Sequence, residues 1–472
     1  MTINCDVAIL GGGTGGYVAA IRAAQLGKDV VIIEQDKLGG TCLHRGCIPS
    51  KSLLRSAEVF ALMQDSEHYG VAADNVTLKF ASVQARKQGI VDQLHKGVQY
   101  LMSKNKIRVV QGQGRVIGPS IFSPQSGAVA VEFEDGEMET VVSKNLIIAT
   151  GSRPRDLPGL EADGQLILNS DHALQLEQLP ASILIVGGGV IGMEWASMLN
   201  DFGVQVTVVE AAPQILPLED EEVARELRRL LEKRGVTIYT GAALQLDTYR
   251  PGDGELSIDM LHKEETITLT SSQMLVSVGR RANVETIGLA NTDIQVENGF
   301  IKVNANMQTS EAHIYAIGDV IGGLQLAHAA SHEGIAAVHH LSGEPVHYDA
   351  DQVSRCVYTR PEVASVGITA AQAEAQGKTV KIGKFPFKAI GKALVHGESD
   401  GFVKVIADAQ TDDLLGVQII GPQATDLISE AALAQFLDAT PWEVGQTVHA
   451  HPTLAEIMGE AMLAVDGKAT GM

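Results

Sequence analysis

The sequence predicts an α/β protein in which two strand–turn–helix–strand units of one design precede a mixed α+β C-terminal domain. Residues 5–34 and residues 183–210 each pass from a short apolar strand through a glycine turn into a helix, and end in a second apolar strand. Five residues recur 176 positions apart: Gly11, Gly13, Gly16, Gly27 and Glu34 correspond to Gly187, Gly189, Gly192, Gly203 and Glu210. This shared design predicts two Rossmann-like dinucleotide-binding domains.

The elements outside these two units follow from hydrophobic periodicity. The pattern predicts, in chain order, helices at 52–64 and 81–103, short strands within 106–150, a helix at 219–234, a strand-and-turn region at 271–345 ending in a helix at 327–341, strands at 352–358, 379–388, 401–408 and 414–420, and helices at 424–438 and 453–464. Charged residues dominate the helix at 219–234, and we interpret them as a solvated face. Strands between helices after residue 346 predict the mixed α+β domain.

The charge balance excludes several classes of function. The chain of 472 residues has 36 Lys+Arg against 57 Asp+Glu, a net charge of −21. A general nucleic-acid or anionic-membrane binder needs a basic face, so neither class is expected. Aromatic residues make up only 4% of the chain, which argues against a base-stacking surface. The acidity instead fits a basic protein partner.

Cysteine usage and the absence of targeting patterns bear on the compartment. The four cysteines are Cys5, Cys42, Cys47 and Cys356. Four in a chain of this length do not make a secreted disulfide framework, so we expect a reducing compartment. No basic and apolar leader opens the sequence, and no apolar run approaches the roughly 20 residues of a transmembrane helix. We therefore expect a soluble, cytoplasmic protein.

The two glycine turns predict phosphate binding for a physical reason. The first glycine permits the tight bend, the second lets the backbone approach a pyrophosphate, and the third lets helix and strand pack closely. The phosphates then meet the N–H groups at the helix N-terminus. Glu34 and Glu210 close the two second strands, where we expect them to accept hydrogen bonds from adenosine ribose hydroxyls. A carboxylate there repels a 2′-phosphate, so Glu210 favours NAD over NADP.

The segment GGTCLHRGCIPSK, residues 39–51, places two cysteines four residues apart. On an ideal helix their Cα atoms would rise by about 7.5 Å, beyond the usual disulfide separation. Gly46 and Pro49 are expected to loosen this turn enough for Cys42 and Cys47 to bond. A redox-active disulfide is favoured over two unrelated buried thiols or half of a metal site, because no second Cys/His pair lies nearby.

Together these motifs resemble the FAD-dependent pyridine nucleotide–disulfide oxidoreductases. The resemblance covers the whole chain and includes ATG at 149–151, the second fingerprint at 187–192, TSEAHIYAIGD at 309–319 and HPTLAE at 451–456. It implies an FAD-binding domain with the redox disulfide at 1–150, an NAD-binding domain at 151–275, a central domain completing the FAD site at 276–345, and an interface domain for dimerisation at 346–472.

The resemblance also implies a role for each matching residue. Cys42 would meet substrate, Cys47 would face the flavin, and Lys51 would lie near flavin N5 with Glu194 as its acidic partner. The residues that bind the two dinucleotides fall into two groups. For FAD they would be Gly11, Gly13, Gly16, Glu34, Lys51, Gly151 and Asp319. The others would be Gly187, Gly189, Gly192, Glu210 and Gly279, of which the first four belong to the second glycine turn and its strand-ending glutamate.

His451 and Glu456 carry two interpretations. A lone histidine is usually structural, and the histidines of HAH (449–451), like His328 and His332, raise the question of a metal site. Their carboxylate-poor surroundings make a metal unexpected, and none is predicted. A base for thiol chemistry needs a near-neutral pKa and a carboxylate to orient it. The pair matches the family's His–Glu pair, which acts on the disulfide of the other subunit; this implies a homodimer with composite active sites.

Within the family, the chain most resembles the flavoprotein component of the 2-oxo acid dehydrogenase complexes. That resemblance implies oxidation of protein-bound dihydrolipoamide to lipoamide with reduction of NAD+, and implies lipoyl domains and the subunit-binding domain of an acyltransferase core as partners. Glutathione, trypanothione and mercuric reductases are the rivals, and a flavoprotein kept for assembly is a further alternative. The sequence departs from the family pattern at a few positions, namely Thr14, His44, Arg45, Met193, Trp195 and Ala282.

Overall fold

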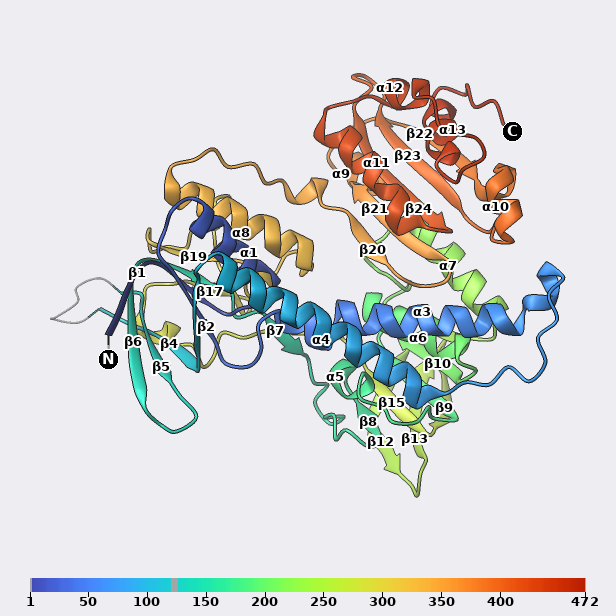
Figure 1. The fold of residues 1–472 in the computed structure, drawn as a ribbon. Helices are drawn as coiled ribbons and strands as arrows, with labels where there is room; N and C mark the ends of the chain where they lie inside the picture. Colours follow the sequence, from blue (N-terminus) through green and yellow to red (C-terminus); the bar gives the residue numbers. More distant parts are fainter. Residues whose placement is uncertain (1, 120–125, 472) are drawn as a thin grey trace. The chain divides into compact units, whose positions relative to one another are not determined.

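The computed structural model describes residues 2–119 and 126–471, so part of the predicted strand region at 106–150 lies outside the described residues. The chain folds into two compact units. The first comprises residues 2–52, 82–119, 126–155 and 280–350, and the second comprises residues 53–81, 156–279 and 351–471. Figure 1 follows the chain through both units by colour. The domain boundaries after residues 150, 275 and 345 stay a prediction.

A seven-stranded sheet forms the centre of the first unit. The strands of this unit are β1 (Thr2–Leu10), β2 (Val30–Glu34), β3 (Arg108–Gln111), β4 (Gln113–Ile117), β5 (Ala128–Glu132), β6 (Met138–Ile148), β7 (Ser152–Pro154), β16 (Arg280–Ala282), β17 (Val296–Glu297), β18 (Phe300–Ile301) and β19 (Ile314–Ala316). The sheet has the order β3-β2-β1-β6-β5-β4, and β19 also pairs with β6. Its β3-β2-β1-β6 part and β19 are parallel. Both faces of such strands are covered, which is why β2 is a continuous apolar run before its final Glu.

The helices of the first unit follow its strands. They are α1 (Thr14–Gln25), α2 (Gly40–Arg45), most of α4 (Phe80–Lys104) and α8 (Ala327–Ser342), while α3 (Cys47–Gln64) begins in the first unit and ends in the second. Glycines let α1 and α8 approach closely (Figure 1). A Cβ atom on Gly15 would lie 2.9 Å from the Ala330 carbonyl oxygen, and one on Gly334 would lie 2.8 Å from the Gly15 carbonyl oxygen.

The second unit contains a second parallel sheet and a small antiparallel one. The parallel sheet has the order β11-β10-β9-β15-β8 and consists of β8 (Ile167–Leu168), β9 (Ser182–Val186), β10 (Gln205–Glu210), β11 (Thr237–Thr240) and β15 (Gln273–Val276). The antiparallel sheet consists of β12 (Ala243–Pro251), β13 (Leu256–His262) and β14 (Glu265–Ser271). The helices of this part are α5 (Ser170–Ala173), α6 (Val190–Asp201) and α7 (Glu221–Lys233).

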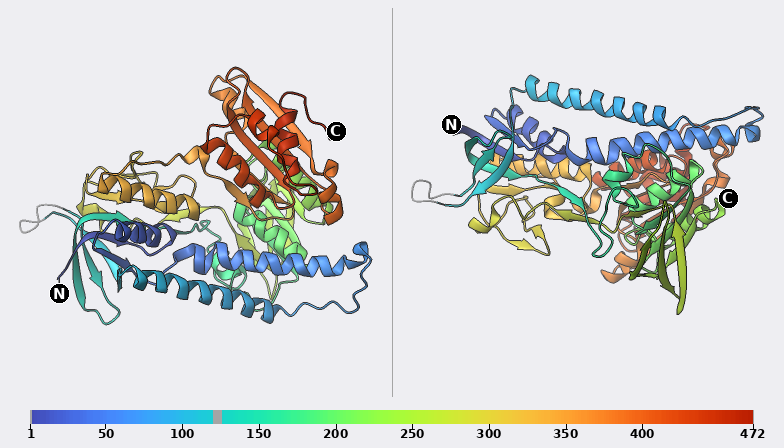
Figure 2. Two further views of the ribbon diagram at one scale, coloured as in Figure 1. Left: turned by 45° about the horizontal axis from the view of Figure 1, so that its top comes forward. Right: turned by 90° about the horizontal axis from the view of Figure 1, so that it is seen from below.

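The C-terminal part of the second unit is a five-stranded antiparallel sheet with helices. Its strands are β20 (Arg355–Val357), β21 (Glu362–Gly367), β22 (Val380–Pro386), β23 (Phe402–Asp408) and β24 (Leu414–Gly421), in the order β20-β21-β24-β23-β22. Its helices are α9 (Ala370–Ala375), α10 (Gly391–His396), α11 (Ala424–Phe436), α12 (Pro441–Gln446) and α13 (Glu456–Ala464). α11 and α13 pack on one face of the sheet around a single apolar core, and both lie against it in Figures 1 and 2.

The predicted fold class is confirmed, since both dinucleotide-binding units and the mixed C-terminal domain are present. The predicted helices correspond to α3, α4, α7, α8, α11 and α13. The interpretation of residues 219–234 as a solvated face is wrong at its N-terminal end. Glu219 and Asp220 are only 8% and 6% exposed, because charged partners in the C-terminal sheet replace the solvent that the charge pattern alone implied.

Candidate active site and dinucleotide sites

The predicted disulfide between Cys42 and Cys47 forms where α2 and α3 meet. α2 ends at Arg45, and Gly46 leaves the helical conformation with φ −149° and ψ −114°. This break brings the two cysteine Cα atoms to 4.7 Å, within the range that a disulfide spans. A Cβ atom on Gly46 would lie 3.1 Å from the Thr41 carbonyl oxygen, so the junction favours glycine.

Cys47 is the first residue of α3, where the helix dipole favours negative charge. The dipole therefore stabilises a thiolate released on Cys47. Lys51 follows four residues later, so it lies one turn further along the same helix face. The other cysteines lie elsewhere: Cys5 is buried on β1, where burial raises its pKa to about 12, and Cys356 is half-buried on β20.

Two histidines meet beside the disulfide loop. The ring nitrogens His44 Nε2 and His95 Nδ1 lie 2.9 Å and 3.0 Å from the same acceptor, the Leu38 carbonyl oxygen. The two rings stand edge to face at 5.1 Å between centroids. Burial lowers the pKa of His44. Arg45, the neighbouring departure from the family pattern, forms an ion pair with Asp36, which offsets its charge.

The first glycine turn has the geometry that a pyrophosphate needs. Gly11 has φ +110°, and a Cβ atom on Gly16 would overlap the Gly11 carbonyl oxygen. Gly13 is the N-cap of α1 and makes no side-chain hydrogen bond there. A Cβ atom on Gly13 would have its nearest neighbour, the Gly40 Cα atom, 3.9 Å away, so the space beside this residue is open. The turn therefore offers backbone N–H donors and room for a phosphate, as an FAD pyrophosphate requires.

The second glycine turn repeats this geometry. Gly187 has φ +108°, and a Cβ atom on Gly192 would overlap the Gly187 carbonyl oxygen. Gly189 caps α6 without a side-chain hydrogen bond, and a Cβ atom there would meet nothing within 4 Å. The turn thus fits the pyrophosphate of a second dinucleotide. Ser277, which sequence reasoning missed, donates to the carbonyl oxygens of Val186 and Gly187 at 3.1 and 3.2 Å.

The two strand-ending glutamates also hold the turns in place. Glu34 accepts from Gly12 N at 2.7 Å and from Asp36 N at 2.8 Å. Glu210 accepts from Gly188 N and from Ala212 N, both at 2.6 Å. A carboxylate has about four lone-pair sites, so each side chain keeps acceptor capacity for a ribose hydroxyl. Burial raises the pKa of Glu34.

Asp319 lies in a polar cluster drawn from three segments of the first unit. Its carboxylate accepts a hydrogen bond from the Ser152 hydroxyl, and Arg280 Nε lies 3.5 Å from Asp319 Oδ2. Arg280 Nε also donates to Ser152 Oγ at 2.7 Å. Gly151, with φ +67°, begins the segment that carries Ser152. Glu333, 7% exposed, accepts from Gly318 N at 2.7 Å and so fixes the turn that presents Asp319.

The predicted His–Glu pair is formed in the second unit. His451 Nδ1 lies 2.7 Å from Glu456 Oε1, and Glu456 Oε2 accepts from Thr453 N at 2.9 Å. The hydrogen bond from His451 lowers the pKa of Glu456 below its usual range. Because the carboxylate holds Nδ1, the other nitrogen, Nε2, is left to accept a proton. The His451 side chain is 77% exposed within a single chain.

A second His–Glu pair lies nearby in the sequence and is buried. His449 Nε2 lies 2.7 Å from Glu430 Oε1, and the His449 side chain is only 11% exposed. Glu194 is also buried, at 6% exposure, and accepts from Tyr358 N at 3.0 Å. Gly279 adopts φ +113° three residues after the end of β15. The partnership of Lys51 with Glu194 stays a prediction.

Comparison with known proteins decides the family. Residues 5–334 match the family described as "Pyridine nucleotide-disulphide oxidoreductase", and residues 353–462 match the dimerisation domain of the same family. The chain belongs to the pyridine nucleotide–disulphide oxidoreductases.

Relatives within this oxidoreductase family match along the full chain. A dihydrolipoyl dehydrogenase of Bacillus subtilis (strain 168) is 61% identical over 471 residues, covering 99% of each chain. A dihydrolipoyl dehydrogenase of Zymomonas mobilis is 43% identical, again over 99% of each chain. Among solved structures, LpdA of Mycobacterium tuberculosis superposes with a TM-score of 0.90 at 28% identity, covering 98% of this chain and 99% of that one.

Family membership confirms the prediction that this oxidoreductase uses FAD and NAD. Its C-terminal match supports the predicted homodimer. Within the described parts of the chain, no three His, Cys, Asp or Glu side chains gather as metal ligands would. None of the helices in residues 2–119 and 126–471 combines the length and apolar character that a membrane crossing requires.

Proposed function

We propose that the protein oxidises protein-bound dihydrolipoamide to lipoamide and reduces NAD+ to NADH. The observation that carries this proposal is the Cys42–Cys47 disulfide in a chain 61% identical, end to end, to a dihydrolipoyl dehydrogenase. The His451–Glu456 pair supports it, because oxidation of a dithiol needs a base to generate the attacking thiolate.

The thiol chemistry follows from the geometry of these residues. His451 Nε2 accepts the proton of a substrate thiol while Glu456 holds the Nδ1–H. The substrate thiolate attacks the Cys42 sulfur, which forms a mixed disulfide and releases Cys47 as a thiolate at the N-terminus of α3. The second substrate thiol then attacks the substrate sulfur that is bonded to Cys42, which closes the lipoamide disulfide and releases Cys42, and the leaving Cys42 thiolate takes up the proton that this thiol loses. Two electrons have moved from substrate to the cysteine pair.

The remaining site residues are proposed to act in the transfer of these two electrons from the cysteine pair to NAD+. Bound FAD supplies the two-electron relay from a dithiol to NAD+. Gly11, Gly13, Gly16, Glu34, Gly151 and Asp319 are proposed to hold it. Lys51 is proposed as the cation that stabilises the reduced form, with Glu194 as its acidic partner. In the homodimer, each His451 is proposed to act on the disulfide of the partner subunit, which its 77% exposure within one chain supports.

The second dinucleotide site is proposed to take NAD rather than NADP. Gly187, Gly189, Gly192 and Gly279 shape it, and Glu210 presents its charge where the adenosine ribose would lie. Because backbone N–H groups satisfy each Glu210 oxygen, the carboxylate is held in position and repels a 2′-phosphate.

Lipoyl domains and the subunit-binding domain of a 2-oxo acid dehydrogenase acyltransferase core are the proposed partners. The net charge of −21 supports a basic binding domain as the partner of an acidic dimer. Gel filtration with such a domain should show a complex at low salt that weakens at high salt. A complex indifferent to salt, or none at low salt, would contradict this electrostatic account.

A steady-state assay tests the proposed reaction. The holoenzyme should form NADH from dihydrolipoamide and NAD+, and Cys47→Ser should abolish this activity although FAD stays bound. Reaction only with glutathione disulfide and NADPH would overturn the proposed substrate and the cofactor preference together. Comparable catalytic efficiency with NAD+ and NADP+ would overturn the role of Glu210 alone.

A further inference from the structure

The loop 211–220 packs against the second glycine turn. It begins directly after Glu210 and ends at Asp220, the N-cap of α7. Leu216 N donates to the Gly188 carbonyl oxygen at 2.8 Å, and Ala212 N donates to Glu210 at 2.6 Å. Leu216 is 2% exposed. These contacts tie the loop to the glycine turn and to the Glu210 carboxylate that would meet the adenosine ribose.

The far end of the loop is tied to the C-terminal sheet by buried charges. Glu219 Oε1 accepts from Arg355 Nε at 3.2 Å, and Glu219 Oε2 accepts from Ser365 Oγ at 2.7 Å. Asp220 accepts from Lys404 Nζ at 2.9 Å. The exposed fractions of the Glu219, Asp220 and Lys404 side chains are 5%, 6% and 5%. Buried charges hold their geometry tightly, because each loses its solvation and depends on its protein partners.

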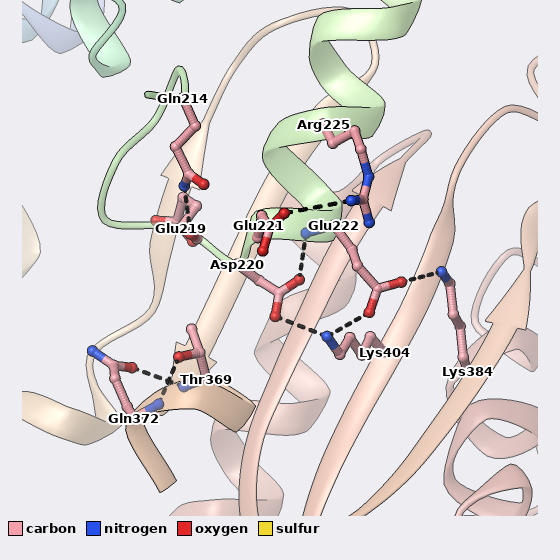
Figure 3. Close-up of polar contacts among 10 residues, drawn as sticks. All are labelled: Gln214, Glu219, Asp220, Glu221, Glu222, Arg225, Thr369, Gln372, Lys384 and Lys404. Carbon is pink, nitrogen blue, oxygen red and sulfur yellow. Dashed lines mark hydrogen bonds and ion pairs between the residues drawn. The ribbon is translucent and has the colours of Figure 1, made fainter. Parts of the chain in front are cut away.

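The cations of this contact come from one row of the sheet. The row consists of successive cross-strand partners in β20, β21, β24, β23 and β22, namely Arg355, Ser365, Gln418, Lys404 and Lys384. Alternate residues of these strands pack on α11 and α13, so the row points to the opposite face. Figure 3 shows Lys404 between Asp220 and Glu222, and Lys384 reaching the outer oxygen of Glu222. The face opposite the apolar core is thus a polar platform for the loop.

We propose that the C-terminal sheet positions the adenosine end of the second dinucleotide site through loop 211–220, with Glu219 as the positioning residue. Glu219 touches neither substrate nor cofactor; it acts by fixing the far end of the loop whose near end carries Glu210. The inference rests on the proposed function only in taking the second site to be the NAD site.

A second buried ion cluster provides a matched control. Asp201, with a side chain 6% exposed, pairs with Arg234 and with Arg360 of the C-terminal part. It resembles Glu219 in burial and in its arginine partner. It differs in place, because Asp201 is the last residue of α6 and lies about 17 Å along the helix from the end that begins at the glycine turn. Neutralising it should weaken the same domain contact without moving the loop.

The test measures binding of ADP-ribose to the full-length holoenzyme by calorimetry, beside the midpoint of thermal unfolding. Glu219→Gln should raise the dissociation constant about fivefold or more, and Asp201→Asn should leave it within about twofold of wild type despite a similar loss of thermal stability. The proposal would be overturned if Glu219→Gln and Asp201→Asn raised the dissociation constant equally, or if Glu219→Gln left it unchanged. Glu219 would then have only a structural role.

Ser365→Ala keeps the inference testable if Glu219→Gln does not fold. It removes one hydrogen bond to Glu219 and leaves both charges, so a smaller rise in the dissociation constant is expected. A wild-type dissociation constant in this variant would also contradict the proposal. Because the ADP-ribose binding assay contains no dihydrolipoamide, failure of this inference is distinguishable from failure of the proposed reaction.

Discussion

Replacement of Lys404 by methionine should destabilise the second unit strongly. Methionine fills the volume of the lysine stem, so the change removes the charge without leaving a large cavity. The Lys404 side chain is 5% exposed, and its Nζ lies 2.9 Å from Asp220 and 2.7 Å from Glu222. Glu222 keeps its contact with Lys384, but Asp220 remains buried and unpaired. Breaking a buried pair in this way costs about 3–5 kcal/mol.

Two further variants separate charge from packing. Lys384→Met removes a cation whose side chain is 44% exposed, so it should cost about 1 kcal/mol or less. Adding Asp220→Asn to Lys404→Met removes the unpaired charge, and asparagine still caps α7, so the double variant should regain most of the lost stability.

Urea unfolding followed by tryptophan fluorescence measures these free energies. The only tryptophans, Trp195 and Trp442, both lie in the second unit, so the signal reports on that unit. The linear dependence of free energy on urea gives the difference between variants. The reasoning is refuted if Lys404→Met loses no more stability than Lys384→Met, or if Asp220→Asn restores nothing.

Four other outcomes are expected. Gly189→Ala should keep the unfolding midpoint of the wild type, because the added Cβ meets no atom within 4 Å. It should nevertheless weaken NADH binding by about tenfold or more in a fluorescence titration, since the pyrophosphate would lie in that space. Unchanged NADH binding would argue against the site. Glu456→Gln should lower kcat about 100-fold with FAD retained, because the amide no longer holds His451 Nδ1 as a carboxylate does. A kcat near that of the wild type would show that the His451–Glu456 pair has no role in catalysis. Cys5 should stay unmodified by iodoacetamide at pH 8 in the native protein, as mass spectrometry would show, because burial raises its pKa to about 12; rapid alkylation would contradict that burial. Hydrogen bonds to Lys384 and then Lys404 lower the pKa of Glu222 from 4.5 to about 2, so this carboxylate contributes stability above about pH 4.5 that is lost as the pH falls toward 2. The urea midpoint of the wild type should therefore fall more steeply over that interval than the midpoint of Glu222→Gln.

The features predicted from the sequence are those that a few neighbouring residues determine. The glycine turns depend on spacings of two to five residues, and the disulfide depends on a junction between two short helices. The His451–Glu456 contact likewise spans five residues. Each local pattern therefore contained the information that its geometry required.

The features that sequence reasoning missed join segments far apart in the chain. Ser152, Arg280 and Glu333 surround the Asp319 turn from separate segments, and no local spacing relates them. The charged helix at 219–234 was misinterpreted for the same reason. Periodicity identifies a charged face, but it does not distinguish water from a polar row such as the one containing Lys404. The three-stranded sheet at 243–271 lies in a stretch for which no element was predicted.

Anaerobic titration of the holoenzyme with dihydrolipoamide, followed by thiol alkylation and mass spectrometry, tests the central claim most directly. One equivalent of dihydrolipoamide should open the Cys42–Cys47 disulfide, make Cys42 reactive toward the alkylating reagent, and give a new long-wavelength absorption from the Cys47 thiolate beside the flavin. NAD+ should then restore the oxidised spectrum. Retention of the disulfide after the titration, or wild-type NADH formation in the Cys42→Ser variant, would contradict the account.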